Sequence, residues 1–150
     1  MKIAIIPSLF LLVGCFAGEN GAGSERGALR SEVEFVADEG LEESVVVDSL
    51  VWIPFLPHLG FGSKTEFEGG FSGVFRNVGT TEVWVRYDLR FFDREEFLID
   101  AFIPFGQPVV LAAGETERVA GEFRIRSEDP RDFERLSLMR LVARIRWPEQ

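Results

Sequence analysis

The sequence predicts an all-β domain, built as an antiparallel β-sandwich of seven or eight strands with one short helical crossover. Three observations lead to this fold. Apolar and polar residues alternate with a period of two over long stretches, which is the pattern of strands with one buried face. Turn-forming residues recur roughly every 8 to 15 residues, as they do in sandwiches. Fifteen phenylalanines supply large side chains for a core between two sheets.

The clearest strand is predicted at residues 83–92, where alternation is sustained throughout. Residues 67–75 predict a second strand, with phenylalanine and glycine on one face. Between them, Asn77 and Gly79 supply turn chemistry, because glycine readily adopts a positive φ. We therefore expect these two strands to form a hairpin.

Further runs complete the predicted sandwich at residues 33–37, 45–53, 97–102, 109–111, 116–126 and 136–147. In the last run, one face is predicted to carry Met139, Leu141, Ala143, Ile145 and Trp147. Residues 127–135 predict the helix, because Ser127 or Asp129 can cap it and Pro130 suits a first helical position. We expect this helix to cross from one sheet to the other.

The N-terminus has the parts of a secretory signal peptide: Lys2, an apolar run over residues 3–13, and small residues before a cleavage point. The ending Leu-Val-Gly-Cys at residues 12–15 resembles the lipobox of bacterial lipoproteins. That resemblance implies that residues 1–14 are removed and that Cys15 is acylated. A membrane-spanning helix is the poorer interpretation, because the run is shorter than the ~20 residues of a span and contains Pro7. Cleavage without lipidation is the remaining alternative.

Residues 15–32 are then interpreted as the lipidated cysteine and a flexible tether, and residues 33–150 as the sandwich domain. The tether is rich in glycine and lacks periodicity. Behaving as a coil, it has a root-mean-square span of about 20 to 25 Å. It either holds the domain clear of the lipid headgroups or serves attachment alone.

The cysteine count and the net charge restrict the kinds of partner that we expect for this chain. Cys15 is the only cysteine, so no disulfide can form within the chain. The formal net charge of −9 becomes −10 when the segment containing Lys2 is removed. Such a chain is repelled by nucleic acid and by anionic headgroups, so we expect no nucleic-acid partner and attachment to the membrane through acyl chains.

Three segments carry a family resemblance: FSGVFRNVGTTEVWVRYDLRFFD at residues 71–93, VVLAAGE at 109–115 and FRI at 123–125. Their layout resembles the immunoglobulin-like domains of small bacterial envelope proteins, closest to FxLYD-type domains and YcfL-like lipoproteins. The resemblance implies an immunoglobulin-like sandwich without catalytic residues. The chain departs from the pattern at residues 94–96, where a glycine is common, and at residues 52–62, which are longer and more apolar than that connection normally is.

The residue inventory argues against catalysis. His58 is the only histidine and is predicted to lie in a loop, so a nucleophile-histidine pair would depend on it alone. Cys15 is expected to be acylated. Carboxylates gather at residues 38–43 and 93–96, but neither cluster has the spacing of a calcium loop. We expect no catalytic residue, no cofactor and no metal.

Two features could bind a partner. The first is the apolar segment 52–62, which the prolines at residues 54 and 57 keep from being an interior strand throughout. Its Trp52, Phe55, Leu56 and Phe61 could form an exposed patch for a protein partner or the membrane surface; otherwise the segment folds back over one end of the sandwich. The second is the polar face of residues 83–92, with Trp84, Arg86, Arg90 and Phe92; otherwise this face is covered by the opposing edge or by arginine stems.

The function expected from the sequence is a noncatalytic, lipid-anchored interaction or accessory module of the cell envelope, with an envelope protein as its partner. A glycan-binding domain stacking sugars on Trp84 or Trp52 is the alternative, followed by an enzyme of unrecognised type. Phe16 follows the cysteine where enteric-type sorting uses aspartate for inner-membrane retention. The expected location is the periplasmic face of the outer membrane in a cell with two membranes.

Overall fold

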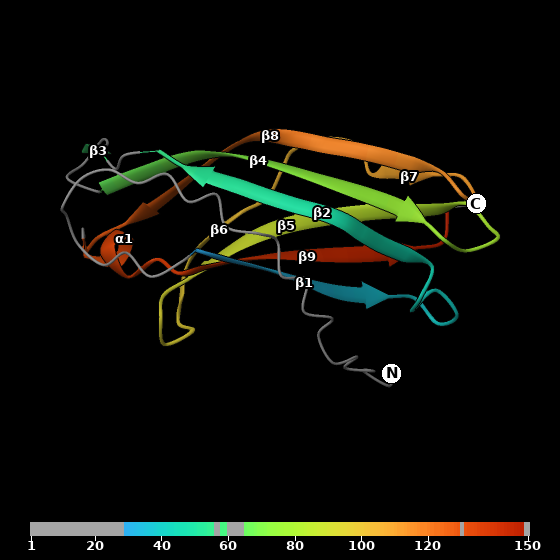
Figure 1. Ribbon diagram of the computed structural model, residues 1–150, viewed down its shortest axis with the longest axis horizontal. Coiled ribbons are helices and arrows are strands. Elements are labelled where there is room, and N and C mark those ends of the chain that lie inside the picture. The colour runs from blue at the N-terminus through green and yellow to red at the C-terminus, as the bar shows by residue number, and fades with distance from the viewer. Residues whose placement is uncertain (1–28, 56–57, 60–64, 130, 149–150) are drawn as a thin grey trace, which may run out of the picture.

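The computed structural model describes residues 29–55, 58–59, 65–129 and 131–148. They form an all-β fold of two sheets packed face to face, with one short helix (Figure 1). The first sheet contains β1 (Arg30–Ala37), β9 (Leu138–Arg146), β5 (Val83–Phe92) and β6 (Leu98–Phe102) in that order, with β7 (Val109–Leu111) also paired to β5. The second sheet contains β2 (Val45–Pro54), β4 (Thr65–Asn77) and β3 (His58–Leu59), with β8 (Thr116–Ser127) on the other side of β4.

The predicted all-β fold is confirmed, but its antiparallel pairing has one exception in the first sheet. β1 runs parallel to β9 over its whole length, from Arg30 opposite Leu138 to Ala37 opposite Ile145. The other pairings in both sheets are antiparallel. Two parallel strands are not joined by a tight turn, so no local turn pattern in the sequence predicts that they pair. The immunoglobulin-like assignment itself remains a prediction.

The predicted hairpin is also wrong, because β4 and β5 belong to different sheets. The buried side chain of Asn77 fixes the connection between them. Its amide nitrogen donates to the carbonyls of Thr81 at 2.8 Å and Leu111 at 3.0 Å, while its oxygen accepts from the backbone N–H of Gly79 at 2.8 Å. The turn therefore carries the chain across to β5 of the first sheet, and the bond to Leu111 fastens it to the end of β7. The apolar faces of β4 and β5 then meet across the core, where the rings of Phe75 and Tyr87 lie 5.7 Å apart.

The core between the sheets is aromatic, as predicted. Phe91 of β5 is fully buried and lies 5.8 Å from Trp52 and 4.6 Å from Phe123, between ring centroids. A Cβ at Gly69 would come within 2.3 Å of the Phe123 ring and 2.6 Å of a β2 carbonyl. Glycine is therefore required at residue 69, because any side chain there would occupy the space of the Phe123 ring.

The last strand combines a confirmed face with an unexpected one. Met139, Leu141, Ala143 and Ile145 are fully buried, as predicted for the inward face. The outward residues Leu138 and Val142 are buried as well. Trp147 lies beyond the end of β9 and is 45% exposed, so it does not continue the apolar face.

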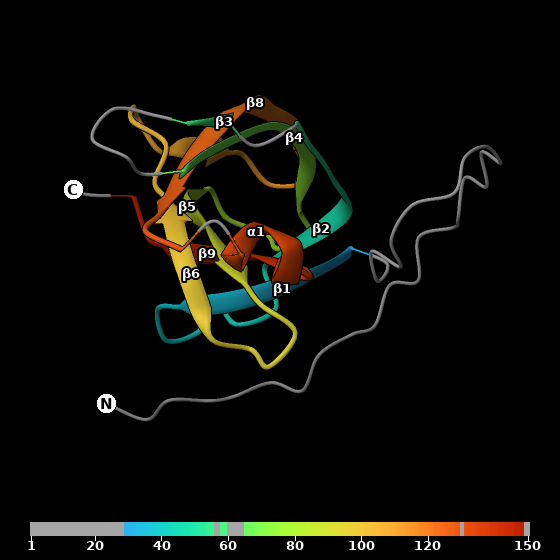
Figure 2. The same cartoon turned by 90° about the vertical axis from the view of Figure 1, so that its left-hand side faces the viewer.

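The helical crossover is confirmed in place but is shorter than predicted. It is a single turn, α1 (Asp132–Arg135), between β8 of the second sheet and β9 of the first. Figure 2 shows α1 at one end of the two sheets. Its Phe133 is buried and stacks on Phe67 at 4.8 Å, which covers this end of the core. Neither Ser127 nor Asp129 is the N-cap residue, which is Arg131 and makes no side-chain cap bond. Asp129 Oδ1 nevertheless accepts the backbone N–H of Arg131 at 2.9 Å, directly before the helix.

β1 begins at Arg30, earlier than the predicted start at residue 33, because its backbone pairs with β9 from that residue on. The signal peptide, Cys15 and most of the tether fall on residues 1–28, outside the described residues. No helix within the described segments is long and apolar enough to cross a bilayer.

Candidate binding surfaces

The predicted binding role of Trp52 is wrong, because this residue belongs to the core. Its side chain is only 7% exposed and contacts Phe91 and Phe123 from β2. The indole N–H donates to the Arg30 carbonyl at 3.3 Å, which links β2 to β1 across the neighbouring edges of the two sheets. A sugar ring could not stack on it without unfolding this edge.

The rest of the apolar segment is only partly described. Phe55 directly follows β2 and is 49% exposed, so it remains available for contact. Leu56 and Phe61 lie outside the described residues. His58, predicted to lie in a loop, instead forms β3 with Leu59 and pairs with Glu66 and Thr65 of β4.

The most exposed apolar side chains lie elsewhere. Phe105 and Ile103, in the connection between β6 and β7, are fully and 66% exposed, and Phe97 before β6 is 67% exposed. None of the three was predicted as a binding residue. An Ile-Pro-Phe run at residues 103–105 repeats the one at residues 53–55, which is the signal that could have drawn attention to it.

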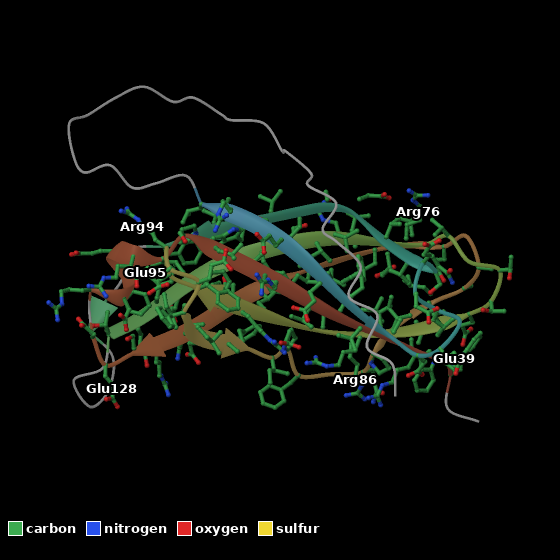
Figure 3. All side chains as sticks on the ribbon, turned by 90° about the horizontal axis from the view of Figure 1, so that it is seen from below. Glu39, Arg76, Arg86, Arg94, Glu95 and Glu128 are labelled. Carbon is green, nitrogen blue, oxygen red and sulfur yellow. The ribbon has the colours of Figure 1, made fainter. Side chains whose placement is uncertain are left out.

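The second predicted surface is part of a larger one. On the outer side of the first sheet, Trp84, Arg86 and Arg90 of β5 share a face with arginines of β9. The register sets Arg86 opposite Arg144, Arg90 opposite Arg140, and Trp84 opposite Arg146. We call the outer side of β5 and β9 the arginine face, defined by Arg86, Arg90, Arg140, Arg144 and Arg146. Figure 3, which views the molecule from this side, labels Arg86 on it.

A buried carboxylate lies at the centre of the arginine face. The Asp88 side chain is 7% exposed and faces Val142 across the strands. Its Oδ2 accepts from the Arg90 Nε at 2.8 Å, and its Oδ1 accepts from Arg144 Nη1. Such charge-assisted bonds are strong, and one carboxylate here fixes the direction of two guanidinium groups.

Arg140 is held from two sides. Its guanidinium donates to Glu32 of β1 at 2.9 Å, and it lies 4.8 Å from the ring centroid of Phe92. Phe92, Leu138 and Val142 are buried although they point outward, and the Arg140 guanidinium lies over the Phe92 ring. An arginine therefore covers at least the Phe92 end of this face.

Arg86 and Arg146 differ from the other three. Both are exposed, and neither side chain has a hydrogen bond or an ion pair among the described residues. Beside them, the Trp84 indole nitrogen is buried without an acceptor in the same part of the chain. This end of the arginine face thus carries positive charge that no acid of the described segments pairs with. Asp88, Arg140, Arg144 and Arg146 were not predicted as site residues, although the even spacing of the arginines at residues 140, 144 and 146 places them on one face of a strand.

The acidic turn after β5 uses its carboxylate for structure. Asp93 Oδ1 accepts the backbone N–H groups of Glu95 and Phe97, both at 2.9 Å. The turn also holds Glu96 at a positive φ of 63°, which side chains rarely adopt. Within the described ranges no three His, Cys, Asp or Glu residues gather as metal ligands do.

Comparisons with known proteins add little. A scan against models of protein families finds no match, and a search of curated proteins finds none either. Among solved structures, the chain is similar to the crystal structure of Campylobacter jejuni cj0090, with 18% sequence identity and a TM-score of 0.35. The alignment covers 73% of this chain and 95% of that one. At this TM-score no conclusion on fold or function follows from the likeness.

Proposed function

We propose that the protein is a noncatalytic, lipid-anchored interaction module of the cell envelope. The observation that carries the proposal is the lipobox-like ending at residues 12–15, which follows a basic residue and a short apolar run. Cys15 is the only cysteine of the chain, so attachment of lipid is a sufficient reason for its presence.

The domain that follows supports the proposal. β1 begins at Arg30, so residues 16–29 remain as a connection between Cys15 and the fold. The domain offers an arginine face on a rigid sheet, and arginine and tryptophan are common anchors of protein interfaces. A glycan-binding role is less well supported, because Trp52 lies in the core and the indole N–H of Trp84 is buried.

The anchoring is tested with Cys15→Ala and its conservative partner Cys15→Ser, expressed with the full leader. We expect the wild-type chain in the membrane fraction, with a mass increase corresponding to acyl chains on residue 15. Both variants should leave that fraction while keeping the circular dichroism spectrum of the β-domain. Membrane retention of the variants, together with an unmodified Cys15 in the wild type, would overturn the proposal.

A further inference from the structure

The pairing of β5 with β9 sets like charges against each other twice. Arg86 lies directly opposite Arg144, and four residues along β5 Arg90 lies directly opposite Arg140. Like charges at directly opposed positions destabilise a sheet. On the second sheet, two outward rows of β4 and β8 instead pair opposite charges, with Glu66 opposite Arg126 and Glu68 opposite Arg124.

The acids on the first sheet neutralise only part of the arginine face. Asp88 bonds Arg90 and Arg144, and Glu32 bonds Arg140. Arg86 and Arg146 remain exposed, with no acidic partner among the described residues. Their rows are adjacent, since Arg146 faces Trp84 and Arg144 faces Arg86.

Three of the five arginines are held by contacts within the first sheet. Asp88 orients the guanidinium groups of Arg90 and Arg144, and Phe92 and Glu32 orient that of Arg140. The side chains of Arg86 and Arg146 have no such contact among the described residues, so their guanidinium groups are available to a ligand. The planar guanidinium presents its donors in a fork that matches a carboxylate, which a lysine cannot do.

We propose that the arginine face recognises an acidic, extended segment of a protein partner, with Arg86 and Arg146 as the groups that bind its carboxylates. Arg86 and Arg146 lie on neighbouring strands in adjacent rows, so they are diagonal neighbours roughly 7 to 8 Å apart. Carboxylates at alternate positions of an extended segment are about 6.6 to 6.8 Å apart, and the long arginine side chains can reach two of them. Trp84 and the 45% exposed Val110 of β7, which share a row with Arg146, supply apolar contact beside them. The inference rests on the proposed role as an interaction module, but not on the lipid anchor.

Charge favours a short segment over a membrane surface or a nucleic acid. The whole chain carries −9, so a large polyanionic surface meets net repulsion. A short segment interacts with the arginine face alone, because charges farther than about 8 Å are screened at physiological salt.

The experiment measures fluorescence anisotropy with a labelled peptide of alternating Glu and Thr, eight residues long, and a matching peptide of alternating Gln and Thr. The full-length protein is used in detergent at low and at high salt. We expect binding of the Glu peptide that weakens as salt rises, and binding of the Gln peptide that is at least about tenfold weaker.

A pair of double variants locates the site. Arg86→Ala with Arg146→Ala should weaken Glu-peptide binding by about tenfold or more. Arg118→Ala with Arg124→Ala removes the same charge from the exposed outer side of β8 and should change it less than about twofold. Melting temperatures report that each variant is folded.

Three results would overturn the inference: no binding of the Glu peptide by the wild type, equal losses in both double variants, or binding that depends on Arg86 and Arg146 only for vesicles of phosphatidylglycerol and phosphatidylcholine. Cys15→Ala, measured in parallel, separates the two proposals. Peptide binding by a variant that has left the membrane supports the arginine face whatever the chemistry at Cys15.

Discussion

The outer sides of the two sheets use the same residue types in opposite ways. On the second sheet, arginines of β8 meet acids of β4: Arg126 donates to Glu66 at 2.8 Å and Arg124 donates to Glu68 at 2.6 Å. On the first sheet, the arginines of β5 and β9 face one another around the buried Asp88. The pairing on the second sheet neutralises charge locally, whereas the pairing on the first sheet concentrates positive charge. The difference teaches that a chain of net charge −9 can still present a positive face, because register decides which charges become neighbours.

The largest expected effect contrasts the two sides of β5 itself. Phe91→Ala should lower the free energy of unfolding by about 3 to 5 kcal/mol, because it removes a fully buried ring between Trp52 and Phe123. Arg90→Ala, on the neighbouring outward position, should cost about 1 kcal/mol or less. Urea titrations measure the free energy of unfolding of both variants. Equal losses would mean that the outer side of β5 contributes to stability as much as its inner side.

A smaller loss should follow removal of the acid at the centre of the arginine face. Asp88→Ala should cost about 2 to 3 kcal/mol, because it leaves two partly covered guanidinium groups without their shared carboxylate. Asp88→Asn keeps the shape and one acceptor and should cost less. Denaturant midpoints of the two variants give the comparison. A neutral effect of Asp88→Ala would show that Arg90 and Arg144 reach water freely.

On the second sheet the corresponding change should matter little. Glu68→Ala removes the partner of Arg124, but both side chains are partly exposed, at 32% and 56%. Surface pairs contribute roughly 0.2 to 1 kcal/mol. A double-mutant cycle of Glu68→Ala and Arg124→Ala should therefore give a coupling below about 1 kcal/mol that falls further as salt is added. A larger coupling would remove the contrast between the two faces.

The smallest expected effect is a loss of stability at low pH. The Arg76 guanidinium, which bonds Asp48 at 2.8 Å, lowers the pKa of that carboxyl below its ordinary value. A lowered folded-state pKa contributes stability that is present above the unfolded pKa and is lost as pH falls through the folded one. Melting temperatures of wild type and Asp48→Asn should thus differ slightly near neutral pH and converge in acid. A difference that persists unchanged below both pKa values would exclude this ion pair as its source.

Local patterns predicted most elements correctly, since the inward residues of β5 and β9 follow from alternation alone. Leu89, Phe91, Met139 and Leu141 are all fully buried. The placement of Trp52 failed for a related reason. Prolines at residues 54 and 57 suggested an irregular loop, but β2 continues to Pro54 and its Trp52 faces the core. Proline at the end of a strand breaks no pairing that the preceding residues need.

The sequence by itself determined what depends on neighbouring residues: an all-β chain, the strand faces and a short crossover before the last strand. The tertiary structure alone decided what depends on distant ones. Asn77 and Leu111 lie far apart in sequence, yet the hydrogen bond from the Asn77 side chain to the Leu111 carbonyl holds the connection between the two sheets in place. Arg86 meets Arg144 only because β5 pairs with β9 in one register. Alternation fixes which way a side chain points, whereas the identity of its neighbour is set by strand pairing, which a period of two does not encode.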